Sequence, residues 1–90
     1  MKSTTYASLV TIVFVLHKDQ IATSIEGVIR EVDELCEELG LKCDLSHMTK
    51  YRVISDMLKN NILVTRKTKR NKKLRLSKQI RELLEESSPS

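Results

Sequence analysis

Apolar residues recur at helical spacing in three segments before the chain reaches its first short alternating stretches. The first segment, residues 4–17, holds an eleven-residue apolar run at positions 6–16. Many of these residues are β-branched, but the length of the run and the hydroxyls of Ser3 and Thr4, which suit a helix N-cap, favour a helix over a strand. Polar positions cover so little of this helix that we expect it to lie at the centre of the domain or to be shared with a second copy.

The second segment predicts an amphipathic helix over residues 24–39. Its core-facing residues recur every three or four positions and are Ile25, Val28, Ile29, Val32, Leu35, Cys36 and Leu39. Thr23 or Ser24 is the expected N-cap, and Gly40 supplies the left-handed residue that commonly ends a helix. The outer face is acidic, so we expect it to point away from any polyanionic partner.

The third segment predicts a helix over residues 47–60 with Ser46 as its N-cap. The residues expected to face inward are Met48, Tyr51, Ile54 and Leu58. The residues expected to face outward are Thr49, Arg52, Val53, Asp56 and Asn60, with Ser46 and Lys50 at the margin. About four turn-like residues follow Gly40 before the Ser46 cap, and two helices joined by a tight turn have the arrangement of a helix-turn-helix.

Residues 62–77 start and end in an alternation of apolar and polar positions and predict a β-hairpin with strands over residues 62–68 and 72–77. The apolar positions expected to face the core are Val64, Leu74 and Leu76. A last helix over residues 78–86 has Ile80, Leu83 and Leu84 on one side, and residues 87–90 are expected to form a frayed tail. Residues 1–86 therefore predict an α+β domain, mostly α, of winged helix-turn-helix type: a three-helix core, a basic hairpin wing and a C-terminal helix.

The net charge of +4 hides an asymmetry between the two halves of the chain. Residues 1–41 hold three Lys or Arg against seven Asp or Glu, whereas residues 42–90 hold thirteen against five. Seven of the cations lie within the ten residues 66–75, on the predicted hairpin. Lysines also protect sheet edges from aggregation, but seven exceed that need. We therefore expect the hairpin to neutralise DNA phosphates beside a major groove that holds the third helix.

The residues expected to contact double-stranded DNA form two groups. On the third helix and its cap they are Ser46, His47, Thr49, Lys50, Arg52 and Val53. On the hairpin they are Arg66, Lys67, Lys69, Arg70, Lys72, Lys73 and Arg75. The alternative is a winged helix that docks on a protein partner through its apolar helices. In either case the first and last helices are the surfaces through which we expect two copies to form a dimer.

The stretch GVIREVDELCEELGLKCDLSHMTKYRVISDMLKNNILV, residues 27–64, resembles the C-terminal winged-helix domain of the origin-recognition initiator ATPases of archaeal type. The resemblance implies that Thr49, Lys50 and Arg52 face the groove and that residues 66–73 grip the backbone. No ATPase motif is present, and Asn61 stands where a Gly is common. The resemblance therefore implies DNA binding alone and not initiation activity. The chain is also similar to small winged-helix repressors of viruses and plasmids, so roles in transcription regulation and in DNA replication stay open.

Length and residue spacing argue against several other classes of function. Ninety residues leave little room for an enclosed catalytic pocket, so we expect no enzyme activity, small-molecule substrate or cofactor. Cys36, Cys43, His17 and His47 lack the spacing of a zinc site. An eleven-residue apolar run is too short to cross a bilayer, and no cleavage site follows it. With two cysteines that suit a reducing interior, we expect a cytoplasmic or nucleoid-associated protein without membrane contact.

Overall fold

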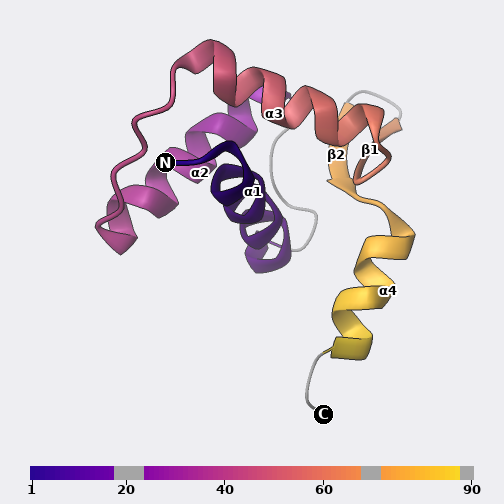
Figure 1. Cartoon of the computed structure of the whole chain (residues 1–90). Coiled ribbons are helices and arrows are strands. Elements are labelled where there is room, and N and C mark those ends of the chain that lie inside the picture. The colour runs from indigo at the N-terminus through magenta and orange to yellow at the C-terminus, as the bar shows by residue number, and fades with distance from the viewer. Residues whose placement is uncertain (18–23, 68–71, 88–90) are drawn as a thin grey trace.

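The computed structural model describes residues 1–17, 24–67 and 72–87, which form helices and one β-hairpin (Figure 1). In chain order the elements are α1 (Ser3–His17), α2 (Ile25–Leu39), α3 (His47–Lys59), β1 (Leu63–Lys67), β2 (Lys72–Leu76) and α4 (Lys78–Ser87). The predicted α+β class with a mostly helical chain is confirmed, and the helix boundaries fall within a residue of the predicted ones. Among the described residues, no helix combines the length and apolar character needed to cross a membrane.

Helix α1 forms the centre of the core, as its nearly uninterrupted apolar run predicted. Its buried residues are Tyr6, Leu9, Val10, Val13 and Phe14. The helix lies beneath α3 and beside α2 (Figure 1), and it also contacts β2. The other elements add Val28, Ile29, Val32, Cys36, Ile54, Met57, Leu63, Leu74 and Leu76 to the same cluster. Leu39, which was expected to face inward, is exposed at the end of α2.

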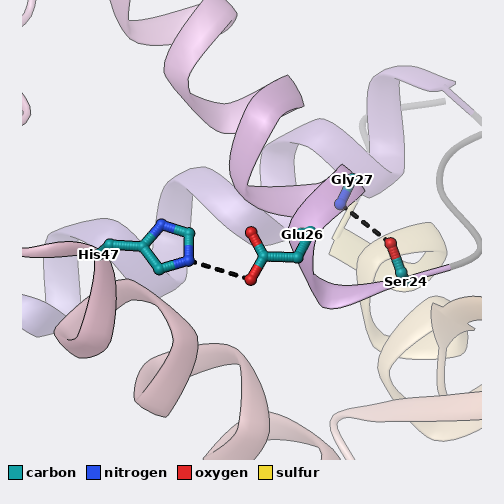
Figure 2. A network of polar contacts seen from close by, with 4 residues as sticks. All are labelled: Ser24, Glu26, Gly27 and His47. Carbon is teal, nitrogen blue, oxygen red and sulfur yellow. Dashed lines mark hydrogen bonds and ion pairs between the residues drawn. The ribbon is translucent and has the colours of Figure 1, made fainter.

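Local capping contacts set the ends of α2 and the start of α3. The Ser24 hydroxyl accepts a hydrogen bond from the Gly27 backbone N–H at 3.2 Å (Figure 2). Gly40 adopts φ 69°, and the Leu41 N–H donates to the Cys36 carbonyl at 2.8 Å, which ends the helix in a left-handed turn. At α3 the Ser46 hydroxyl accepts from the backbone N–H of the residue three positions on, at 3.2 Å. Side chains close in sequence therefore satisfy the unpaired backbone groups at these helix ends.

The connection between α2 and α3 differs from the tight turn that the sequence predicted. It spans residues 40–46 without regular structure, and it leads from the end of α2 back toward the first turn of that helix (Figure 1). At its far end His47 contacts Glu26 in the first turn of α2. Helix α3 therefore starts close to the start of α2 rather than close to its end.

Helix α3 is rotated about its axis relative to the prediction. Met48 and Tyr51, expected in the core, are 73% and 45% exposed. Ile54 and Met57 are buried instead, and Val53, expected to face outward, is half-buried against the core. This stripe faces α1 and α2, the helices against which α3 packs.

The hairpin is antiparallel and pairs Leu63 with Leu76, Thr65 with Leu74 and Arg66 with Lys73. Leu63 is fully buried, whereas Val64 is half-buried and lies on the opposite face of the strand. The prediction that Val64 faces the core was therefore wrong by one position, and a shift of one residue exchanges the two faces of a strand. Leu74 and Leu76 are buried as predicted.

Two helices leave apolar residues at the surface. On α1 these residues are Ile12, Val15 and Leu16. Helix α4 extends away from the helical core (Figure 1), with Ile80 packed against the core and with Leu83 and Leu84 exposed.

Candidate nucleic-acid interface

The outward face of the hairpin presents cations from both strands. Because strand residues alternate between faces, Arg66, Lys73 and Arg75 lie on the face opposite Leu63, Leu74 and Leu76. Arg66 and Lys73 are exposed and stand directly opposite one another in the register. Within residues 1–17, 24–67 and 72–87, no carboxylate forms an ion pair with Arg66, Lys67 or Lys73. The hairpin is thus a positively charged surface without acidic compensation in the described part of the chain.

Backbone hydrogen bonds fix the hairpin to the end of α3. The Ile62 N–H donates to the Met57 carbonyl at 2.9 Å, and Asn61 takes φ 58°, a left-handed conformation that Asn tolerates better than most residues. On the return strand side, the Ser77 N–H donates to the Ile62 carbonyl at 2.9 Å. With Leu63 buried directly after this junction, the position of β1 relative to α3 is set by short backbone links.

The exposed face of α3 consists of residues three and four positions apart: Met48, Tyr51, Arg52, Asp56 and Lys59. Arg52 faces solvent as the sequence predicted. The other two residues near the start of this face, Met48 and Tyr51, were assigned to the core and so were missed as candidate contacts. The sequence does contain a signal for their exposure. Val53 and Met57 form a second apolar stripe, and if this stripe faces inward, Met48 and Tyr51 face outward.

Two of the predicted contacts at the start of α3 are held by carboxylates of α2. His47 Nε2 lies 3.0 Å from Glu26 Oε1, and Figure 2 shows these side chains pointing toward one another across the two helices. Lys50 Nζ donates to Asp33 Oδ1 at 3.0 Å, and the Lys50 side chain is only 13% exposed. Both residues link α3 to α2 in the structure, but only Lys50 is shielded from solvent, because the His47 side chain remains 62% exposed beside Glu26.

The charge state of Lys50 reflects this environment. Burial alone would disfavour its ammonium form, but the hydrogen bond and the charge of Asp33, together with the neighbouring Cys43, outweigh burial and raise the pKa of Lys50 above its ordinary value. Lys50 is therefore a firmly charged partner of Asp33. A contact between Lys50 and a base edge would require this ion pair to open.

The remaining predicted contacts divide by what surrounds them. Ser46 and Thr49 are engaged with each other, because the Ser46 hydroxyl caps the Thr49 N–H and their hydroxyl oxygens lie 2.9 Å apart. Lys69 and Arg70 lie outside the described residues, and Lys72 is described only by its strand pairing with Lys67. The described candidates that are exposed and form no ion pair or hydrogen bond with another described side chain are Arg52 on α3 and Arg66, Lys67 and Lys73 on the hairpin.

The chemistry available at this surface is the binding of anions. Guanidinium and ammonium groups on a ribbon pinned to an exposed helix can neutralise phosphates, and Arg52 can donate to base edges. Among the described residues, no three His, Cys, Asp or Glu side chains are grouped so that they could hold a metal ion.

Comparison of the chain with family models, with curated proteins and with solved structures gave no match.

Proposed function

We propose that this protein binds double-stranded DNA as a small winged helix-turn-helix module, with α3 in the major groove and the hairpin on the phosphate backbone. The observation that carries the proposal is the Arg66–Lys73 pair on the outward face of the hairpin. Like charges directly opposite one another destabilise a sheet. A polyanion bound along this face would offset that repulsion, because its phosphates attract both cations. Each phosphate that is neutralised also releases condensed counterions, which favours binding.

Helix α3 supplies the base-reading part of the proposal. Arg52 is exposed and can donate two hydrogen bonds to guanine O6 and N7, a contact that discriminates between bases by about 1–3 kcal/mol. Met48 and Tyr51 lie on the same exposed face, Met48 about one turn nearer the start of the helix and Tyr51 directly before Arg52. Their apolar surfaces suit contact with thymine methyl groups, whereas in the core they would have had no part in recognition.

The acidic residues of α2 support one orientation of this module on DNA. Glu34, Glu37 and Glu38 are exposed, and phosphates would repel them. The cationic hairpin follows α3 rather than α2, so an approach through α3 and the hairpin brings cations to the backbone before carboxylates. The same charge separation steers the encounter before contact is made.

A second copy of the chain is the partner that we propose for α1. Its residues 3–16 include no charged side chain, although Ile12, Val15 and Leu16 are exposed. The hydroxyls of Ser8 and Thr11 donate to carbonyls of their own helix, so burial of this face would leave those donors satisfied. A face without charge can meet its own copy with no like-charge repulsion, and a two-fold dimer would present two hairpins to adjacent half-sites.

Binding of an acidic protein partner is a second candidate function. It is favoured by the exposure of Met48 and Tyr51, because apolar and aromatic residues beside cations are also typical of protein interfaces. In this case the hairpin would contact carboxylates and α3 would supply the apolar part of the interface. The two candidates differ in how strongly binding depends on salt and on the length of the polyanion.

The test is a fluorescence titration of the full chain against a labelled duplex and against an acidic polypeptide of matched length, at several salt concentrations. If four to six cations reach phosphates, log K for the duplex should fall against log salt with a slope of about −4 to −5. Stronger binding to the polypeptide, or a duplex slope near zero, would reject DNA binding as the function of this surface.

A further inference from the structure

A group of mainly titratable side chains lies between α2 and α3, away from the cations of the hairpin. The residues line one depression between α2, the following connection and α3, and are Asp33, Cys36, Glu37, Leu41, Cys43 and Lys50. Two of them are cysteines, and neither is in a disulfide. The DNA interface proposed above makes no use of either thiol.

The backbone brings the two cysteines together. Gly40 in its left-handed conformation reverses the chain at the end of α2, and the Leu41 N–H returns to the Cys36 carbonyl at 2.8 Å. The connection then runs back along α2, because its far end meets the first turn of that helix through His47. Cys36 and Cys43 consequently line the same depression, and Cys43 packs against the core cluster that contains Cys36.

The two thiols differ in access and in surroundings. Cys36 is 2% exposed within the core cluster, whereas Cys43 is half-buried and faces the depression. The Lys50 side chain, held by Asp33, lines the same depression as Cys43. Burial, followed by the neighbouring Cys43, raises the pKa of the Cys36 thiol. Cys43 is therefore the sulfur that an outside reagent meets first, and Cys36 is the sulfur placed to react second.

We propose that Cys36 and Cys43 are a site of oxidative modification at which a small disulfide oxidant of the glutathione type closes an intramolecular disulfide. Cys43 loses its proton, and its sulfur attacks one sulfur of the oxidant, breaking the S–S bond and releasing one thiol. Cys36 then loses its proton and attacks the Cys43 sulfur, releasing the second thiol. The protein loses two electrons and two protons, and one oxidant molecule is reduced to two thiols.

The disulfide would fix the α2–α3 connection. It closes a short loop over residues 36–43, which restricts the unfolded chain and raises the midpoint of thermal unfolding by roughly 10 °C. Lys50 would retain its hydrogen bond to Asp33. The modification therefore restrains the connection that leads into α3 and leaves the hairpin unchanged.

The experiment treats the folded full chain with glutathione disulfide, quenches with iodoacetamide and measures intact mass. The expected product is two hydrogens lighter than the reduced chain and carries no alkyl group. Cys43→Ser should block the reaction, whereas Cys36→Ser should stop at one glutathione attached to Cys43. Because a change at the buried Cys36 can reduce stability, Cys36→Ala serves as a second variant, and circular dichroism establishes that each variant is folded.

Comparison with the unfolded chain tests whether the fold brings the two cysteines together and so accelerates disulfide formation. The second step, closure of the ring, should be at least about tenfold faster in the folded chain than in the urea-unfolded chain at the same pH, because the two cysteines already line one depression. Equal or slower closure in the folded chain would overturn the proposal, as would accumulation of the glutathione adduct without closure. Both measurements are independent of DNA, so their outcome does not depend on the proposed function.

Discussion

Replacing Arg66 and Lys73 together by Gln separates binding from folding at the hairpin. The two side chains are exposed and directly opposite one another, and no carboxylate of the described chain pairs with them. Each phosphate contact contributes about 0.9 to the slope of log K against log salt, so losing two should flatten the slope by about 1.8. Extrapolated from 1 M salt, this corresponds to roughly 60-fold weaker duplex binding at 0.1 M salt.

Folding should respond in the opposite direction. Removing a like-charge cross-strand pair leaves the free energy of unfolding unchanged or raises it by about 0.2–1 kcal/mol. The assay is therefore fluorescence anisotropy with duplex over a series of salt concentrations, paired with urea unfolding of the same preparations. A variant that binds less well and is also less stable would point to a damaged hairpin rather than to lost phosphate contacts.

The matched control is the double variant Lys2→Gln and Lys42→Gln. Both residues are exposed, and the change in net charge is the same. The N-terminus and the α2–α3 connection lie on the opposite side of the molecule from the hairpin (Figure 1). If this control flattens the slope as much as the hairpin variant does, binding follows net charge alone, and the reasoning from the Arg66–Lys73 pair is refuted.

Other outcomes follow from burial. Tyr51→Ala should leave the free energy of unfolding within about 1 kcal/mol of the parent while it weakens specific duplex binding, whereas Ile54→Ala should cost about 2–5 kcal/mol in urea unfolding. Tyr6→Phe should raise the free energy of unfolding by about 1–3 kcal/mol, because the buried Tyr6 hydroxyl has no hydrogen-bond partner among the described residues. Burial, followed by the charge of Asp33, raises the pKa of Tyr6, so the parent should lose stability as the pH rises above about 10, and Tyr6→Phe should lose less in the same unfolding series. Ile12→Glu should convert a dimer to a monomer in sedimentation velocity at micromolar concentration, and a parent chain that is already monomeric would remove the proposal for α1.

Features set by neighbours in the sequence could be predicted from it. Ser24, Gly40 and Ser46 act within a few residues of the helix ends that they fix, so their roles depend little on the rest of the fold. The central place of α1 also followed from its own composition, since a helix apolar on most sides has to be covered on most sides. The acidic outer face of α2 was visible in the same way.

The orientation of α3 could not be predicted, because its sequence holds two apolar stripes that share Ile54. One stripe uses Met48 and Tyr51, and the other uses Val53 and Met57. The choice between them depends on the shape of α1 and α2 beneath the helix, which helical spacing does not contain. Adjacent apolar residues caused the same ambiguity in the hairpin, where Leu63 rather than Val64 enters the core.

Partners distant in sequence changed the candidate site most. A helical wheel puts Lys50 beside the outward face, but it contains no information about the contact with Asp33, which lies on another helix. The same limit applies to His47 and Glu26. The exposure of Arg52 was predicted correctly because it does not depend on a contact with α2. The outward face of β1 was not, because Leu63 rather than Val64 enters the core and Arg66 shares the face of Val64.

The position of α1 has a consequence for the newly made chain. Helix α1 is synthesised before α3 and β2, which supply part of its cover and follow about 40 to 70 residues later. At about 5–20 residues per second, the uncharged run of α1 waits roughly 2 to 14 seconds for those partners to be synthesised. During that interval its surface is available to other nascent chains and to chaperones. Cellular yield should therefore depend on translation speed, even among synonymous genes that encode the same folded protein.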